Sequence, residues 1–261
     1  MKVTVLGGAG GYPTAHQGCS GFLLEHDGFR LVVDPGYATI QRLLTLVGAD
    51  EVDAVWVSHG HPDHCADLQP LLRARALRMP PATAPLPVYA PLGSLAPLLA
   101  LDQPDTVDRA YVLHDIADGD MFDIGPLHCA ARDLPHMVPN LGIRITADAA
   151  TTNAATTNAA TTPAALAYTG DCGPSPAVAE LAAGADLLIA NATFPESVAE
   201  PRTAFLSSAR QAGTYAQSAG AKALMLTHLW PGSDPDAAFA AAAETYDGPV
   251  EVASPGLIMV L

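Results

Sequence analysis

Three histidines and one aspartate crowded into six residues have the clearest capacity for chemistry in this chain. The run reads Ser58-His59-Gly60-His61-Pro62-Asp63-His64. Neutral imidazole nitrogens and carboxylate oxygens are ligands of Zn²⁺ and similar divalent ions. Side chains alternate along extended backbone, so His59 and His61 are expected to point the same way, while Pro62 forces a turn before Asp63 and His64. One turn is thus predicted to supply two neighbouring metal positions.

Three further candidate ligands each follow an apolar run. They are His136 after 127–134, Asp171 after 166–170, and His228 after 223–227. Short apolar runs are typical of buried strands, and functional residues often lie on loops at the ends of such a scaffold. A single histidine in this place is more often structural. The cluster at 59–64, together with three more candidates at strand ends, is hard to explain by packing alone. We therefore expect the four segments to meet.

The elements that must position these residues form a mixed pattern. Strand-like runs occur at 3–6, 21–25, 30–33, 54–58, 88–90, 127–132, 141–146, 165–169, 187–190, 223–227 and 257–260. Helix-like stretches occur at 37–46, 66–78, 176–183, 207–218 and 236–244. The first third favours hairpins and the last third alternates helix and strand. This order predicts layered sheets with helices outside.

Length and composition set the broad class. With 261 residues, 49% of them hydrophobic, a single domain over 1–261 with a packed core is expected. A low-complexity repeat of Thr, Asn and Ala between two strand-like runs predicts a hairpin loop at 149–164. No apolar stretch approaches the 18 or so residues of a membrane span, and the N-terminus lacks signal-peptide features. The four cysteines form no CxxC pair, so a cytoplasmic location is the expectation.

The net charge bears on partners. It is −15, with only twelve Lys and Arg residues, which argues against a long nucleic acid as a partner. Arg73, Arg75 and Arg78 form the one local basic cluster, either a solvated helix face or a site for a small anion. The sequence therefore favours a small-molecule substrate. A two-fold homodimer is the most common oligomer for a chain of this kind.

In order and residue type, the candidate ligands resemble those of the metallo-β-lactamase superfamily. The matching residues are His59-x-His61-x-Asp63-His64, His136, Asp171 and His228. The resemblance extends from Met1 to about His228. It implies an α/β (α+β) fold, namely the αββα four-layer metallo-β-lactamase sandwich, and a site for two divalent metal ions.

Position by position, the resemblance implies a role for each ligand. His59, His61 and His136 would hold the first metal, Asp63, His64 and His228 the second, and Asp171 would bridge both. Asp34 would fix a ligand imidazole from behind. The ions would be Zn²⁺, although the same ligands accept Mn²⁺ or Fe²⁺. A metal-bridged hydroxide would attack the substrate, with Asp63 as the catalytic residue that orients it or takes its proton.

Within the superfamily, the chain looks most like the ribonuclease Z-like branch and its bacterial cyclic-nucleotide phosphodiesterase members. The similar stretches are Leu6–Pro13, Gly18–Leu24, Tyr168–Gly173 and Leu226–Leu229. The long arm with which ribonuclease Z grips tRNA has no obvious counterpart. The glycines at 7–11 lack the GxGxxG pattern of a nucleotide loop and predict a tight turn that brings backbone near the metals. Trp230, just after His228, would wall a pocket or simply pack.

Two positions depart from that branch. Asn191 occupies the place of a Glu, and Phe205 the place of a His that is thought to assist proton delivery. An amide and a phenyl ring cannot shuttle a proton at neutral pH. The leading expectation is a dinuclear metal-dependent hydrolase acting as a small-molecule, cyclic-nucleotide-like phosphodiesterase. The alternatives are a lactone, ester or amide hydrolase using the same metals, and a non-catalytic metal-binding or sensor protein.

Overall fold

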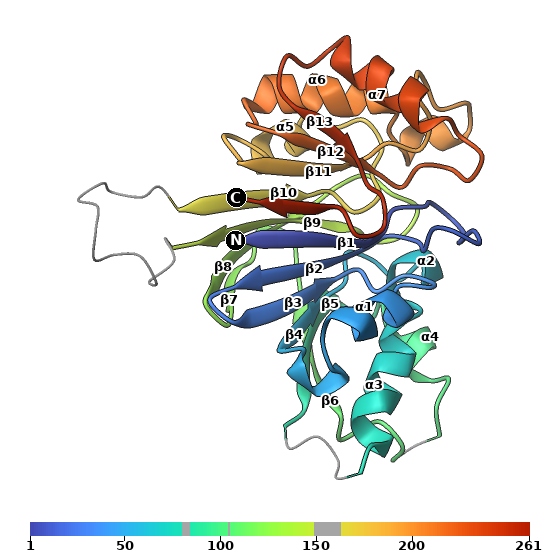
Figure 1. The fold of residues 1–261 in the computed structure, drawn as a ribbon, viewed down its shortest axis with the longest axis vertical. Helices are drawn as coiled ribbons and strands as arrows, with labels where there is room; N and C mark the ends of the chain where they lie inside the picture. Colours follow the sequence, from blue (N-terminus) through green and yellow to red (C-terminus); the bar gives the residue numbers. More distant parts are fainter. Residues whose placement is uncertain (80–83, 104, 149–162) are drawn as a thin grey trace.

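Two seven-stranded sheets face each other in the computed structural model, which describes residues 1–79, 84–103, 105–148 and 163–261 (Figure 1). The first sheet has the order β14-β1-β2-β3-β4-β5-β6. Its strands are β1 (Lys2–Gly7), β2 (Gly21–His26), β3 (Phe29–Val33), β4 (Ala54–Trp56), β5 (Leu86–Pro91), β6 (Tyr111–Ile116) and β14 (Ile258–Val260). Antiparallel pairing joins β14, β1, β2 and β3, and parallel pairing joins β3 to β6.

The second sheet has the order β13-β12-β11-β10-β9-β8-β7. Its strands are β7 (Met121–Ile124), β8 (Leu127–Asp133), β9 (Leu141–Ala147), β10 (Ala164–Tyr168), β11 (Leu187–Asn191), β12 (Leu224–Thr227) and β13 (Val250–Val252). Strands β7 to β10 pair antiparallel, and β10 to β13 pair parallel. In both sheets, therefore, several parallel strands end at the same edge.

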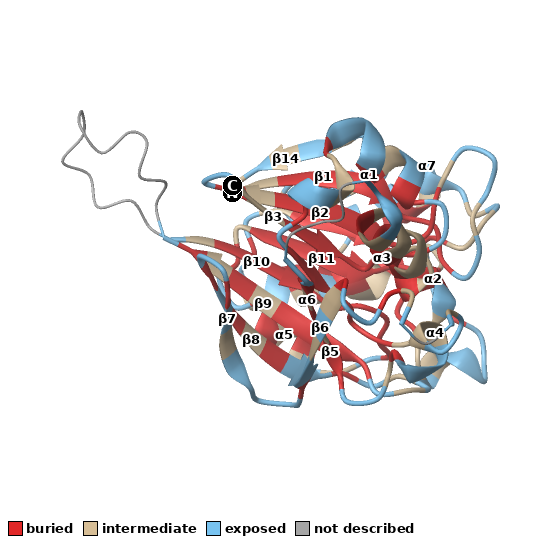
Figure 2. Ribbon diagram, turned by 90° about the horizontal axis from the view of Figure 1, so that it is seen from below, coloured by how far each residue is buried: buried red, intermediate tan, exposed pale blue. Residues whose placement is uncertain are grey.

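Side chains point alternately to the two faces of a strand, so successive residues join different apolar layers. Leu31 and Val33 face the other sheet and join the core between the sheets, whereas Val32 lies among residues packed against the helices. Across the central core, the rings of Phe22 and Tyr168 contact edge to face at 5.5 Å. Because both faces of each sheet are covered, the central strands are buried almost throughout (Figure 2). This explains the near-continuous apolar runs in the sequence.

Helices cover the outer face of each sheet. On the first sheet lie α1 (Ile40–Leu46), α2 (Pro62–Cys65), α3 (Leu68–Leu77) and α4 (Ala96–Leu99), and on the second lie α5 (Ala177–Leu181), α6 (Ala209–Ala219) and α7 (Pro235–Ala243) (Figure 1). Short 3-10 helices are formed by η1 (Ala49–Glu51) and η3 (Arg202–Ala204). The αββα sandwich expected from the sequence is confirmed. No helix in these described ranges combines the length and apolarity needed to cross a membrane.

All eleven expected strands and five expected helices have counterparts, but the boundaries differ. The helix expected from 37 begins at Ile40, and β4 ends at Trp56 rather than at Ser58. Strands β6, β7 and β13 and helices α2 and α4 were not expected. β6 and β7 are largely exposed at sheet edges, and β13 has three residues, so none carries a strong apolar signal. Of the hairpin loop expected at 149–164, residues 149–162 lie outside the described part of the chain.

Candidate metal centre

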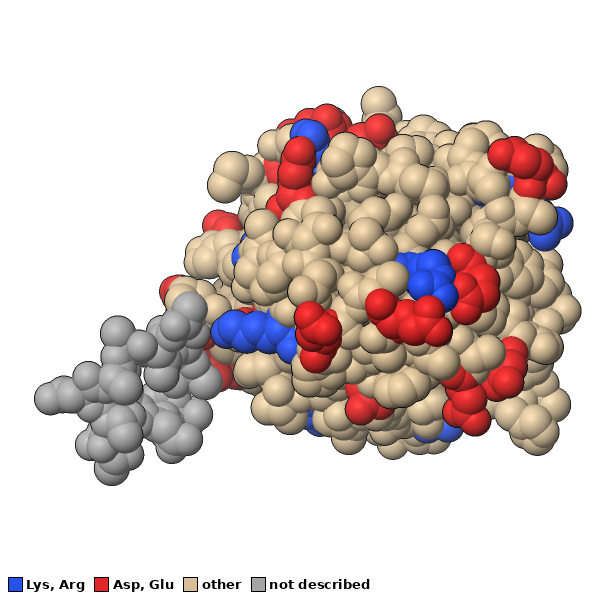
Figure 3. All heavy atoms as spheres, turned by 90° about the horizontal axis from the view of Figure 1, so that it is seen from above, with Lys and Arg blue, Asp and Glu red and all other residues tan. Residues whose placement is uncertain are grey.

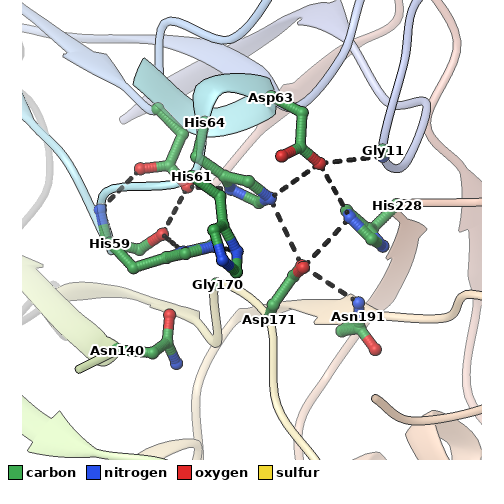
Figure 4. A network of polar contacts seen from close by, with 12 residues as sticks. Gly11, His59, His61, Asp63, His64, Asn140, Gly170, Asp171, Asn191 and His228 are labelled. Atoms are coloured by element: carbon green, nitrogen blue, oxygen red, sulfur yellow. Dashed lines mark hydrogen bonds and ion pairs between the residues drawn. The ribbon is translucent and has the colours of Figure 1, made fainter. Parts of the chain in front are cut away.

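The seven expected ligands lie together in two adjacent groups. Group 1 consists of His59, His61 and His136, and group 2 consists of Asp63, His64, Asp171 and His228. Within each group the ligand atoms lie within 4.8 Å of one another. Figure 4 shows the side chains of group 2 facing a common centre, with His59 and His61 beside them.

The two sheets supply these residues from the carboxyl ends of parallel strands. His59 follows β4, Asp171 follows β10, and His228 directly follows β12. Pro62 at the first position of α2 starts the turn that presents Asp63. Thus both halves of the sandwich contribute to one site, as expected where parallel strands of open sheets end.

The three imidazoles of group 1 converge on their ring nitrogens. Nδ1 of His61 lies 3.1 Å from Nε2 of His59 and 3.1 Å from Nε2 of His136. Burial, assisted by the nearby charge of His64, holds the pKa of His59 well below its usual value. Burial also lowers the pKa values of His61 and His136. Three neutral rings with converging nitrogens form a donor set suited to a divalent cation such as Zn²⁺.

Group 2 pairs two carboxylates with two imidazoles. Nε2 of His228 lies 3.2 Å from Oδ2 of Asp63 and 3.0 Å from Oδ2 of Asp171. Burial disfavours a charged His228, but the carboxylates, Asp171 foremost, outweigh burial and raise its pKa to about 9. Burial raises the pKa of Asp171 and of Asp63, because it disfavours the charged carboxylate. The adjacent imidazoles outweigh burial and lower the pKa of both carboxyls. Both aspartates therefore stay ionised.

One buried nitrogen tests whether this centre suits a cation. Nε2 of His64 is buried without a hydrogen-bond partner. It points between Oδ1 of Asp171 at 3.4 Å and Oδ2 of Asp63 at 3.5 Å. A buried polar atom that lacks a hydrogen bond is costly in a folded protein, even with charged oxygens nearby. A divalent cation would satisfy it together with both carboxylates, so the donor set fits a metal.

Asp34 organises ligands of both groups from behind, as expected. Its Oδ2 lies 2.7 Å from Nδ1 of His64 and accepts hydrogen bonds from the hydroxyls of Ser58 and Tyr168, each at 2.6 Å. Ser58 Oγ in turn lies 3.0 Å from Nδ1 of His59. Such partners fix ring orientation and increase ligand basicity. Asp34 has a φ of 48°, a left-handed conformation held by this network.

Main-chain groups also hold ligands in place. Nδ1 of His136 donates to the carbonyl oxygen of Phe205 at 2.9 Å. The amide of Gly11 donates to Oδ2 of Asp63 at 2.8 Å, so the glycine-rich turn approaches the centre as expected. At Gly10 a Cβ atom would lie 2.6 Å from the His228 ring, which explains why this position has no side chain.

A cavity of about 280 Å³ opens over both groups. Its floor includes His61, Asp63, Asp171 and His228, and its walls include Met137, Phe205, Trp230 and Arg202. Trp230 thus walls the cavity, the first of the two readings left open by the sequence. Burial raises the pKa values of the Cys65 and Cys172 thiols to about 12, so neither is a thiolate near neutral pH.

The sequence did not single out Arg202 or Thr193. Thr193 Oγ1 lies 3.3 Å from Nδ1 of His228. Arg202 lies near Trp230 in space, with its guanidinium carbon 5.1 Å from the ring centroid. Neither residue belongs to a ligand motif, and an isolated Arg or Thr on a connecting segment carries no local signal of a site.

The basic cluster identified in the sequence has structural partners on or beside α3. Arg73 pairs with Asp102, and Arg78 pairs with Asp50. Arg75 is buried and donates to backbone carbonyls. None of the three lines the cavity over the ligands. The solvated or structural interpretation of this cluster is therefore the better one.

Comparisons with known proteins agree with this geometry. A family model described as a beta-lactamase superfamily domain matches residues 29–229. The Bacillus subtilis protein YhfI is 29% identical over 261 residues, covering 99% of each chain. Its crystal structure, described as that of a metallo-beta-lactamase fold protein, aligns with a TM-score of 0.83 at 28% identity, over 99% of this chain and 98% of that one.

Proteins named ribonuclease Z or tRNase Z are also similar. A ribonuclease Z of Myxococcus xanthus is 26% identical over 302 residues, covering 100% of this chain and 98% of the relative. The crystal structure of the short form of human tRNase Z aligns with a TM-score of 0.74 at 21% identity, over 100% of this chain and 99% of that one. At that identity, the second likeness concerns the fold alone.

Proposed function

Because this chain belongs to the beta-lactamase superfamily, as a ribonuclease Z-like metal-dependent hydrolase, we propose that it is a dinuclear phosphodiesterase for small anionic esters. The observation that carries the proposal is the adjacency of two ligand groups around one buried centre. Two-metal sites are the usual machinery for displacement at phosphorus.

In the proposed assignment, His59, His61 and His136 hold one ion. Asp63, His64 and His228 hold the other, and Asp171 lies between the two ions. Zinc is the proposed metal because imidazole and carboxylate donors suit it. Bound divalent ions would lower the pKa of a water molecule to about 7 and stabilise negative charge on substrate oxygens.

The remaining chemistry falls to side chains of this chain. Asp63 is proposed to orient the attacking water or accept its proton, and its lowered pKa keeps it ionised and able to accept a hydrogen bond. The amide of Gly11, 2.8 Å from Oδ2 of Asp63, fixes the carboxylate for that role. The ring of Phe205 and the amide of Asn191 supply no proton for the leaving group. Esters with good leaving groups are therefore the proposed substrates.

A small substrate is favoured over a long nucleic acid. The cavity of about 280 Å³ is slightly below the usual range for drug-sized ligands, roughly 300 to 1,000 Å³. The face seen in Figure 3 carries separate Lys and Arg side chains beside acidic ones rather than a broad basic surface. A ribonuclease, as the M. xanthus relative is named, cleaves phosphodiester bonds. We propose that this chain keeps that bond class on a smaller molecule.

A second candidate keeps the metals and changes the bond, to a lactone, ester or amide. Two observations favour it. Asn191 and Phe205 replace the ionisable pair of the phosphodiesterase branch, and Phe205 and Trp230 make one side of the cavity apolar. Attack on a carbonyl carbon would depend less on the missing pair.

A substrate panel separates these two functions. Metal-loaded protein would be assayed on bis-p-nitrophenyl phosphate, cyclic AMP, a lactone and a chromogenic cephalosporin. Turnover of the phosphodiester, lost after chelation and restored by Zn²⁺, is the expected result. Turnover confined to the lactone or cephalosporin would replace the proposal with the second candidate.

A further inference from the structure

One basic side chain lines the cavity over the ligands. Apart from the histidines, Arg202 is the only positively charged residue among the described residues that line it. The other eleven lining residues include no Lys or Arg, and two of them are ionised aspartates at the base of the cavity. A cation at this place in a chain of net charge −15 calls for a specific explanation.

Arg202 has no ion-pair partner within the described residues. Its guanidinium lies over the ring of Trp230, 5.1 Å from the centroid, and its side chain is exposed. Arg210, eight residues later, differs in this respect, because it pairs with Glu196 and Glu244 at 2.6 Å each. The donors of Arg202 thus stay available to an anion in the cavity.

Hydrogen bonds of the main chain connect the segment that contains Arg202 to group 1. The carbonyl oxygen of Arg202 accepts from the amides of Phe205 and Leu206 at 3.0 and 3.1 Å. The carbonyl oxygen of Phe205, in turn, accepts from Nδ1 of His136 at 2.9 Å. One short turn therefore carries the arginine at one end and supports a candidate metal ligand at the other.

The aromatic surface beneath Arg202 is tied to group 2. Trp230 follows His228 by two residues, and its amide donates to the carbonyl oxygen of Thr193 at 3.0 Å. Its ring contacts Tyr12 edge to face at 5.9 Å and would collide with any side chain at Gly11. Arg202 and Trp230 are thus fixed in position relative to both ligand groups, although neither is a ligand.

Burial separates the two ends of the cavity. Asp171 and His228 at the floor are each 3% exposed, whereas Arg202 at the rim is exposed. A phosphate held at the floor would therefore lie deeper than a group that meets Arg202. The ring of Phe205 and the side chain of Met137 line the walls and suit an apolar spacer.

We propose that Arg202, seated on Trp230, binds a second anionic group of the substrate, remote from the phosphate that is hydrolysed. The substrate class is then a small phosphodiester with a further phosphate or carboxylate at its other end. This assignment rests on the proposed function and narrows it. A guanidinium contact with an anion gives a charge-assisted hydrogen bond, which corresponds to about a tenfold gain in binding.

Two chromogenic esters that differ by one phosphate test the proposal. They are thymidine 5′-(p-nitrophenyl phosphate) and the same ester with a 3′-phosphate. Zinc-loaded wild-type protein should show about tenfold higher kcat/KM for the 3′-phosphorylated ester, mainly through a lower KM. The preference should weaken as ionic strength rises, which a purely structural arginine would not cause.

Matched variants assign the effect to Arg202. In Arg202→Met the preference should fall to near unity, and in Arg202→Lys it should be partly kept, because the charge remains. Arg210→Met, outside the cavity, should keep the full wild-type ratio. An unchanged ratio in Arg202→Met, or an equal loss in Arg210→Met, would overturn the proposal.

Binding separates failure of this inference from failure of the proposed function. If neither ester is hydrolysed, the phosphodiesterase proposal fails, and affinity then tests Arg202 alone. Quenching of tryptophan fluorescence would compare thymidine 3′,5′-bisphosphate with thymidine 5′-phosphate, with the buried Trp56 as the constant background. About tenfold tighter binding of the bisphosphate, lost in Arg202→Met, supports the anion site. Equal affinities would reject it.

Discussion

The side-chain amide of Asn191 donates a hydrogen bond from Nδ2 to Oδ1 of Asp171 at 3.1 Å. The amide of Ser207 donates to Oδ1 of Asn191 at 2.7 Å, which fixes the orientation of the Asn191 side chain. Thus Asn191, which stands where the resemblance places a Glu, acts as a donor to a candidate bridging ligand. It orients a carboxylate where its counterpart would add another negative charge.

Asn191→Ala should therefore weaken metal binding. Loss of a hydrogen-bond partner behind a ligand typically lowers metal affinity by about 10- to 100-fold. Competition with a chromogenic chelator would measure the affinity for Zn²⁺. The control is Asn140→Ala, because Asn140 is equally buried but donates to the carbonyl oxygen of Thr169 instead of a ligand. Equal affinities in both variants would contradict the positioning role.

Loss of one ligand from either group should remove turnover but not folding. His61→Ala and Asp63→Ala each leave the two central sheets intact, because both residues lie at the site rather than in the core between the sheets. The expected loss of activity is about 100-fold or more, exceeding the usual cost of losing an outer partner. Circular dichroism would verify the fold, and metal analysis would count the ions that remain. Wild-type rates in either variant would refute the ligand assignment.

Metal binding at group 2 should release protons near neutral pH. The raised pKa values of His64 and His228, the latter about 9, mean that both rings hold protons until a cation displaces them. In the metal-free protein, the protonated His228 stabilises the fold fully below about pH 6.5, its unfolded value, and this contribution is lost as pH rises through about 9.

Calorimetric titration with Zn²⁺ in buffers of different ionisation enthalpy would count these protons. More protons should be released at pH 7 than at pH 9. The variant His228→Gln should release about one proton fewer at pH 7. A count that is independent of pH and unchanged in His228→Gln would show that group 2 is not protonated as described.

The rate of hydrolysis should depend strongly on the leaving group, because the Phe205 ring donates no proton to it. Wild-type protein is expected to hydrolyse bis-p-nitrophenyl phosphate far faster than cyclic AMP, because Phe205 cannot protonate an alkoxide. Phe205→His places an ionisable ring on the cavity wall and leaves the carbonyl contact to His136 in place. General acid catalysis is typically worth about 10²- to 10⁴-fold, so the variant should gain on cyclic AMP and little on the activated ester.

A matched substitution, Phe205→Leu, controls for the change in cavity shape. It should retain metal and lack the gain on cyclic AMP. Equal rates of the two esters in wild-type protein would show that another group delivers the proton.

Local sequence patterns predicted layered sheets with helices outside and placed the ligand candidates at strand ends, whereas the αββα order of the layers was implied by the family resemblance. Central strands buried on both faces must be apolar throughout, so their runs stand out, and the residues after them are readily picked out. The edge strands β6 and β7 were not predicted, because they bury little apolar surface. The predicted helix at 37–46 was too long by three residues, since the segment before Ile40 is a turn.

By itself, the sequence determined the kinds of donor atom and their order along the chain, because ligand type and strand period are local properties. The grouping of these donors was implied by the family resemblance, and the tertiary structure brings them to one centre, since His59 and His228 come from different sheets. It also decided that Asn191 donates to Asp171 and that Arg202 lies on Trp230. These contacts join residues 20 and 28 positions apart in the chain, and the packing of the two sheets and their loops brings them together.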